Sequence, residues 1–124
     1  MPGLTRTLYG HQALKVVVGG IVEREIVEIR LQETTDASAI GIELKADDRV
    51  AGFGHISLRT AIMVFKTANN ITFIAQMTPR QTVELETPFG CILVTLKAIR
   101  GHDAASINIE APKDLKFIIE DPDQ

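Results

Sequence analysis

The chain has one cysteine, one tyrosine and no tryptophan among its 124 residues. Cys91 alone cannot form an intrachain disulfide, and the three histidines lie far apart, so we expect neither a disulfide framework nor a structural zinc site. No apolar run approaches the roughly 20 residues that a membrane-spanning helix needs. The first ten residues, MPGLTRTLYG, lack the apolar stretch of a signal peptide. We therefore expect a cytoplasmic protein without a membrane segment.

Motifs of the common catalytic and nucleotide-binding sites are also missing. The chain contains no GxSxG, HExxH, CxxC, GxxxxGK or GxGxxG pattern. Asp47 and Asp48 are adjacent carboxylates, but neighbours on a strand point to opposite sides, so we interpret them as turn residues. Cys91 begins an apolar segment and is interpreted as a small buried side chain. We expect the protein not to be an enzyme and to need no cofactor or metal ion.

The chain has little excess charge of either sign. Its formal net charge is −3, which excludes the broad positive field on which non-specific nucleic-acid binding depends. Residues 1–67 contain eight Lys and Arg against eight Asp and Glu, whereas residues 68–124 contain five against eight. Any nucleic-acid site must therefore be local.

What the chain does contain is short apolar runs. They are rich in Val, Ile and Thr and are separated by Gly, Asn, Asp and Pro, the pattern of strands and turns. Residues 55–67 are ambiguous because they include a continuous apolar run, and we favour a strand that turns at 68–70 into the next one. Consecutive strands are expected to be antiparallel neighbours. We predict an all-β protein with further strands near residues 4–9, 14–18, 25–32, 39–44, 48–53, 71–77, 82–86, 91–99, 105–110 and 115–119.

Shifting the sequence by 67 residues, without a gap, aligns its second half with its first. Identities of Val and Ile arise by chance between any two β segments, because both alternate along strands. Identities of acidic residues at turns and strand ends are not expected on that ground. Three acidic identities fall in this one register, namely Asp36/Asp103, Glu43/Glu110 and Asp47/Asp114. We therefore predict two copies of one strand-rich unit, at residues 1–54 and 71–124, joined by a linker or hairpin over 55–70 and sharing one core.

The second copy contains RGHDAASINIEAPKDLKF, residues 100–117, and this segment resembles the carbon storage regulator (CsrA/RsmE) family. The resemblance covers about residues 73–121 and is closest at IEAPKD. In the first copy, VEIR (27–30) and IGIE (40–43) are similar to the same family strands. The resemblance implies a five-stranded unit that forms an intertwined homodimer, with the first strand of one subunit beside the last strand of its partner. A tandem chain would form this dimer within itself, as a pseudo-dimeric barrel or sandwich.

The resemblance also implies a translational regulator that binds GGA-containing loops of messenger RNA. The family uses its first strand, pattern LTRR, and its last strand, pattern VHRE. In the first copy, Leu4, Thr5 and Arg6 match the first pattern literally, although an ungapped alignment places residues 8–11 there. In the second copy the pattern falls on residues 75–78, none of which is basic.

The last-strand pattern has lost its arginine in both copies. Ile119 stands at that position in the second copy and Gly52 in the first. Isoleucine supplies neither the charge nor the planar donors of arginine, so we expect at most one RNA site. That site would combine the first-strand residues of the first copy with the lysines near the last strand of the second copy. Its residues would be Leu4, Thr5, Arg6, Lys113 and Lys116.

Two other functions stay open. A degenerate relative that has lost RNA binding would act through contact with a protein partner, and the net charge and the missing arginines favour this alternative. Residues 36–44, DASAIGIEL, also fit the DxSxxG pattern of PilZ domains, which bind cyclic di-GMP. The closely spaced arginine pair, RxxxR, that should precede this pattern is missing. A cyclic di-GMP sensor is therefore the more distant alternative.

Overall fold

The computed structural model describes residues 3–19, 24–32, 38–47, 52–56, 61–66, 70–87 and 89–121. These residues form strands and no helix, so the prediction of an all-β protein is confirmed. Within this part of the chain no helix is long and apolar enough to cross a membrane. The strands are β1 (Gly3–Tyr9), β2 (Ala13–Val18), β3 (Arg24–Leu31), β4 (Ile40–Asp47), β5 (Gly52–Ile56), β6 (Ala61–Lys66), β7 (Asn70–Met77), β8 (Thr82–Thr87), β9 (Gly90–Gly101), β10 (Ala104–Glu110) and β11 (Leu115–Glu120).

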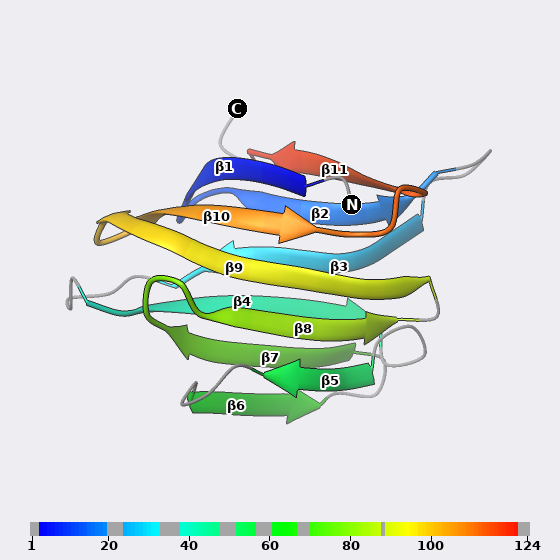
Figure 1. The fold of residues 1–124 in the computed structure, drawn as a ribbon, viewed down its shortest axis with the longest axis horizontal. Coiled ribbons are helices and arrows are strands. Elements are labelled where there is room, and N and C mark those ends of the chain that lie inside the picture. The colour runs from blue at the N-terminus through cyan, green and yellow to red at the C-terminus, as the bar shows by residue number, and fades with distance from the viewer. Residues whose placement is uncertain are drawn as a thin grey trace.

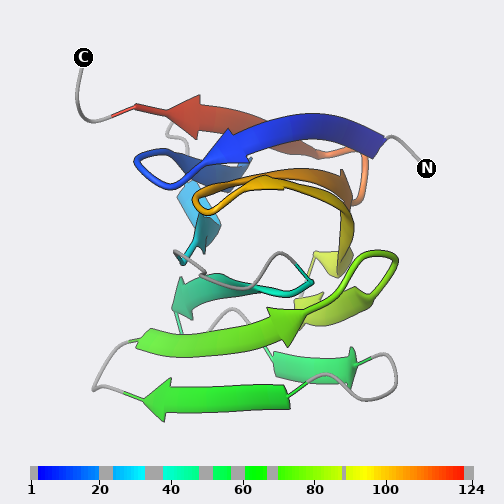
Figure 2. The same cartoon turned by 90° about the vertical axis from the view of Figure 1, so that its left-hand side faces the viewer.

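The strands form two antiparallel sheets that pack face to face (Figures 1 and 2). One sheet has five strands in the order β1-β10-β9-β8-β5, and the other has six in the order β11-β2-β3-β4-β7-β6. The centre of the five-stranded sheet comes from the second half of the chain, and β1 and β5 of the first half flank it. The centre of the six-stranded sheet comes from the first half, and β11 and β7 of the second half flank it. Each half thus contributes strands to both sheets.

One hydrophobic core joins the two halves of the chain. Its fully buried side chains include Leu8 and Ile29 from the first half and Leu85, Leu96 and Ile107 from the second. Because side chains alternate along each strand, each sheet turns one apolar face toward the other sheet. Burying one such side chain contributes about 1.5–3 kcal/mol to folding. The halves stabilise each other through this shared core.

Most strands lie close to their predicted bounds, but the strand predicted at 48–53 lies at Gly52–Ile56. A bulge between Phe53 and Ile56 accompanies this shift in its pairing with β8. Gly52 pairs with Glu86, whereas Ile119 pairs with Leu14. Glu86 is not the residue that lies 67 positions after Leu14. Gly52 and Ile119 therefore do not occupy equivalent places in the two sheets.

The ambiguous segment 55–67 contains strand β6, which forms an antiparallel hairpin with β7, as predicted. The prediction that consecutive strands pair holds within each sheet, for example for β2 and β3. It is wrong wherever the chain crosses between the sheets: β1 pairs with β10, β11 pairs with β2, and the successive strands β4 and β5, β5 and β6, and β7 and β8 do not pair. The reason is that the connections after β1 and β10 carry the chain from one sheet to the other.

The β1–β2 and β7–β8 turns are built alike, and both cross between the sheets. The Gln12 amide donates to the Tyr9 carbonyl at 3.0 Å, and the Tyr9 amide donates to Gln12 Oε1 at 3.1 Å. In the second turn the Gln81 amide donates to the Thr78 carbonyl at 3.2 Å, and the Thr78 amide donates to Gln81 Oε1 at 2.9 Å. A glutamine at the fourth position therefore closes each turn.

The third residue of the second turn is strained. Arg80 has a φ of 79°, a left-handed conformation that costs a residue with a β-carbon about 1–2 kcal/mol. Arg80→Gly is expected to raise the free energy of unfolding by about 0.5–1 kcal/mol, since the relieved strain exceeds the entropy that glycine adds to the unfolded chain. Urea denaturation would measure the gain. Arg80→Ala keeps the β-carbon and is the control, and an equal gain there would assign the effect to the lost charge.

Candidate nucleic-acid interface

Strands β1 and β11 are outer strands of the two sheets and lie side by side at one end of the molecule, running in the same direction (Figures 1 and 2). Among the described strands, β1 pairs only with β10 and β11 only with β2. Each strand therefore presents one row of backbone N–H and C=O groups that no described strand pairs. We refer to β1, β11 and the turn at 111–114 as the β1–β11 edge.

Three of the predicted site residues lie on β1. Leu4 packs against the core and is half-buried, while Thr5 is exposed and its hydroxyl accepts a hydrogen bond from Asn108 Nδ2 at 2.7 Å. Arg6 is exposed and has no ion-pair partner among the residues that the structure describes. Its guanidinium is therefore available to a ligand.

The two predicted lysines lie at the start of β11. Lys113 is exposed in the turn between β10 and β11, and Lys116 is exposed on the outer face of the six-stranded sheet. The stem of Lys116 passes over Gly19, where a β-carbon would lie 3.2 Å from Cε. Within the described ranges neither ammonium group has an ion-pair partner. The structure thus places all five predicted residues on the β1–β11 edge.

The pairing register relates β1 to its counterpart in the second half, β7. Arg6 pairs with Ile107, and Met77 pairs with Ile40, which is 67 positions before Ile107. The neighbouring residues of the two strands keep the same relation. Residues 4–6, the literal LTR match, therefore occupy the same register as residues 75–77, where the resemblance places the family's first-strand pattern. Residues 8–11, the alternative from the ungapped alignment, do not.

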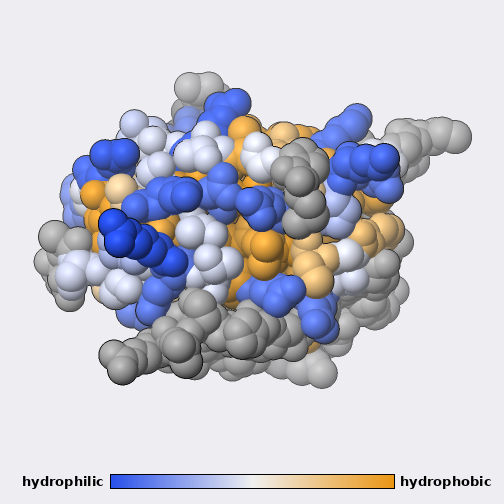
Figure 3. All heavy atoms as spheres, in the orientation of Figure 1, coloured by the Kyte–Doolittle hydropathy of each residue, from blue (hydrophilic) through white to orange (hydrophobic). Residues whose placement is uncertain are grey.

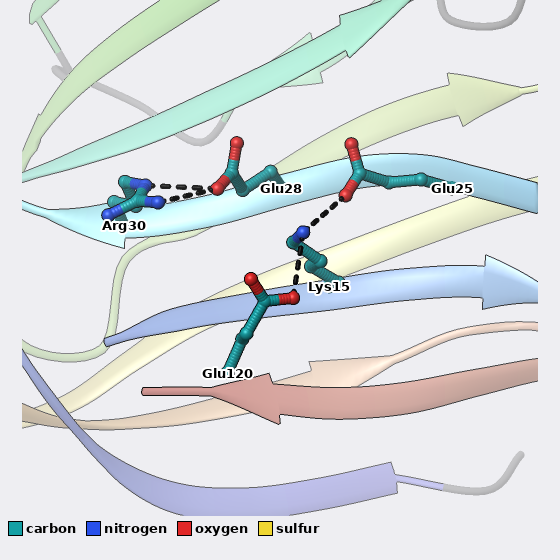
Figure 4. Close-up of polar contacts among 5 residues, drawn as sticks. All are labelled: Lys15, Glu25, Glu28, Arg30 and Glu120. Carbon is teal, nitrogen blue, oxygen red and sulfur yellow. Dashed lines mark hydrogen bonds and ion pairs between the residues drawn. The ribbon is translucent and has the colours of Figure 1, made fainter. Parts of the chain in front are cut away.

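Several other charged side chains on the outer face of the six-stranded sheet are paired with one another. Lys15 Nζ lies 2.9 Å from Glu120 Oε2 and 3.2 Å from Glu25 Oε1, and Arg30 Nη2 lies 2.8 Å from Glu28 Oε1 (Figure 4). The hydrogen bond that Lys15 donates to Glu120 does most to raise the pKa of Lys15, against the opposing effect of burial. Since Glu120 belongs to β11, Lys15 also fastens this outer strand to its sheet. These cations are neutralised within the protein, unlike the three cations of the β1–β11 edge.

The outer face of the five-stranded sheet carries a row of neutral polar side chains. The Asn108–Thr5 hydrogen bond links β10 to β1, and a 2.7 Å hydrogen bond between the Thr82 and Thr95 hydroxyls links β8 to β9. Thr95 lies opposite Asn108, so the row crosses four strands. Figure 3 looks onto this face, where hydrophilic and intermediate residues lie among hydrophobic ones.

Cys91 lies on this same face, and the prediction that it is a buried side chain is wrong. It is half-buried beside the carboxylates of β8, opposite Glu86. A hydrogen bond to the Glu84 carboxylate raises the pKa of the Cys91 thiol, and burial and the charges of Glu84 and Glu86 raise it further. In the described part of the chain no group of three or more His, Cys, Asp or Glu residues is placed to hold a metal ion.

The Cys91 thiol is expected to react slowly with iodoacetamide near neutral pH, because a raised pKa lowers the fraction of reactive thiolate. Glu84→Gln removes the charged hydrogen-bond acceptor and should speed alkylation severalfold. Mass spectrometry of the folded protein over a pH series would measure both the rate and the shift in its midpoint. Glu110→Gln removes a carboxylate from another strand and should change neither. A Glu84→Gln rate equal to that of the unmodified sequence would contradict the assignment.

Other predicted features fall partly outside the described residues. Of the PilZ-like pattern, Ser38 lies in a turn and Gly41 on β4, but Asp36 lies outside the described ranges. The adjacent pair Asp47 and Asp48 is divided in the same way, since β4 ends at Asp47. Neither feature adds a described group of side chains to the β1–β11 edge.

The edge also contains exposed side chains that the sequence prediction did not include. Tyr9 is 45% exposed at the end of β1, and Ile118 is 37% exposed on β11. One signal in the sequence could have found Tyr9. Thr5, Thr7 and Tyr9 occupy every second position of LTRTLY, and a strand places such residues on one face.

Comparisons with known proteins give this edge no counterpart. No family model matches the chain, and no curated protein or solved structure matches it either. The assignment of function therefore rests on the geometry of the chain's own residues.

Proposed function

We propose that the chain is a single-chain relative of the CsrA/RsmE family, in which two five-stranded units form an intertwined pseudo-dimer. The strand order supports this proposal. Strands β2, β3 and β4 form the centre of one sheet, and their counterparts β8, β9 and β10 form the centre of the other. The first strand of each half joins the other half's sheet, since β1 pairs with β10 and β7 with β4. The last strands follow the same rule, since β11 pairs with β2 and β5 with β8.

The function we propose for this pseudo-dimer is RNA binding at the β1–β11 edge, in the manner of a translational regulator. The observation that carries it is the unpaired, exposed Arg6 on an outer strand that lies beside the last strand of the other half. A guanidinium group binds phosphate, or the edge of a guanine, through a planar set of donors. Unpaired bases of RNA loops present such edges, and the open backbone groups of β1 and β11 add further donors and acceptors.

The counterpart of β1 in the second half, β7, is covered by another strand, although β6 and β5 are the outer strands at that end of the sheets. Strand β7 pairs with β4 on one side and with β6 on the other, so its backbone groups are used within the sheet. Met77, which occupies the register of Arg6, is fully buried. This half therefore offers neither an open strand nor a cation in that register, and we propose one RNA site per chain.

A titration with a fluorescently labelled hairpin that carries GGA in its loop would test the proposal, with anisotropy as the readout. We expect saturable binding at micromolar protein or below, with one RNA per chain and an affinity that falls as salt rises. A hairpin of the same length with CCU in place of GGA is the control for sequence preference. Absence of saturable binding at low salt would refute RNA binding.

Contact with a protein partner is the second candidate, and the apolar character of β11 favours it. Ile118 is exposed on the outer face of the six-stranded sheet, and Phe117 and Ile119 are only half-buried. An open outer strand can also pair with an extended segment of another protein. This candidate predicts no RNA binding in the same titration.

A further inference from the structure

We propose that Tyr9 and His11 form a stacking platform for one unpaired base of the RNA bound at the β1–β11 edge. This inference rests on the proposed function and adds a base-binding contact to it. The Tyr9 ring is 45% exposed, its centroid lies 6.0 Å from that of His11, and the two planes are inclined by 25°. Stacking on aromatic rings, histidine included, is a general means of holding the unpaired bases of RNA loops.

The platform is held in place before any ligand arrives. The Tyr9–Gln12 turn is closed by the two hydrogen bonds described above, and the Gly10 amide donates to the Asp103 carbonyl at 2.7 Å. His11 Nε2 lies 3.2 Å from Asp121 Oδ2, just beyond the end of β11. Groups that are already fixed lose less conformational entropy on binding, which favours affinity. This contact also places the platform where the ends of β1 and β11 meet.

Groups that can bind the edges of bases lie beside the platform. Side chains alternate on β1, so the exposed Thr5 and Thr7 share the face of Tyr9, and the half-buried Asn108 lies opposite Thr5 on β10. Their hydroxyl and amide groups can donate to or accept from a base. Arg6 is three residues from Tyr9, roughly 10 Å along the strand, and belongs to the opposite face of β1, so an RNA segment would meet both by passing around the open side of this outer strand.

Of the two matching turns, only the one at the β1–β11 edge carries aromatic rings. The matching turn of the second half has Thr78 and Arg80 in the places of Tyr9 and His11. It follows β7, whose open side β6 closes. The aromatic turn and the unpaired Arg6 thus coincide at one end of the molecule, as a single composite site requires.

Hairpins with 2-aminopurine at single loop positions would test the platform. We expect binding to quench the probe at one or two loop positions, because a stacked 2-aminopurine loses fluorescence. Tyr9→Ala should abolish that quenching and weaken binding about 5- to 150-fold, since stacking on one ring contributes about 1–3 kcal/mol per base. Tyr9→Phe keeps the ring and is expected to retain both the quenching and the affinity.

A second measurement uses the unmodified chain and does not depend on how Tyr9→Ala folds. Because Tyr9 is the only tyrosine, its ring protons give one set of NMR signals, which a stacked base should move upfield. Binding that depends on Arg6, with unmoved ring signals and an unquenched probe, would overturn the platform and leave the proposed function intact. No binding of any GGA hairpin would overturn both.

Discussion

Arg6→Ala is expected to weaken binding of a GGA-containing hairpin about 5- to 150-fold, because one bidentate guanidinium contact to a base contributes about 1–3 kcal/mol. Arg6 is exposed and has no described ion-pair partner, so its loss removes no internal contact and should change the free energy of unfolding by less than about 0.5 kcal/mol. The salt dependence of binding should also flatten, since one cation fewer displaces counterions from the RNA. Anisotropy titrations at several salt concentrations would measure both effects.

Two variants separate a specific contact from a general effect of charge. Arg80→Gly removes the same charge from the turn that follows β7, away from the β1–β11 edge, and should leave the affinity unchanged. Arg6→Lys keeps the charge but loses the planar donors, so we expect an affinity between those of the unmodified chain and Arg6→Ala. Equal losses in Arg6→Ala and Arg80→Gly would mean that RNA responds only to net charge.

Gly90→Ala is expected to lower the free energy of unfolding by about 2–4 kcal/mol, the sum of a backbone penalty and a steric one. Gly90 has a φ of 122°, which residues with a β-carbon rarely adopt. A β-carbon at this position would lie 2.6 Å from Cγ of Pro112, well inside van der Waals contact. Because Pro112 belongs to the turn that leads into β11, relief of the clash would also displace the β1–β11 edge. Chemical denaturation and RNA titration of the same variant would measure both consequences.

Gly101→Ala is the matched control. No atom lies within 4 Å of a β-carbon built on Gly101, and its φ is not positive. This variant should change the free energy of unfolding by less than about 0.5 kcal/mol. Similar losses at both positions would show that the contact with Pro112 is not the cause.

The sequence predicted which segments are strands better than which strands lie side by side. Alternation of apolar and polar residues shows which face of a strand is buried, but it does not identify the neighbouring strand. β1 pairs with β10, about 100 residues away, and no local pattern encodes such a pair. The exchange of first and last strands between halves came as an expectation only from the family resemblance. The ungapped alignment also misplaced β5, because its pairing with β8 relates Phe53 to Leu115, 62 rather than 67 positions later, and the bulge accounts for only one further residue.

The candidate site was predictable where a literal pattern survives. Arg6 and Val16 are ten positions apart, whereas their counterparts by strand pairing, Met77 and Val83, are six apart. A single shift of 67 residues therefore fits the second strands but misplaces the first by four residues. The Tyr9–His11 pair was missed because spacing alone does not show that a turn holds two rings together at the surface.

Because β6 pairs with β7, the proposed RNA-binding function would also differ from that of a symmetric dimer on a long transcript. A symmetric dimer with two open edges can hold two loops of one RNA, and the second contact then forms at a high effective concentration, which can raise the overall affinity by about 10²- to 10⁴-fold. A chain with the single RNA site proposed above would have no such gain from avidity. Under the proposed function, its affinity for a messenger RNA would depend on a single contact, and one chain would not bring two distant loops of that RNA together.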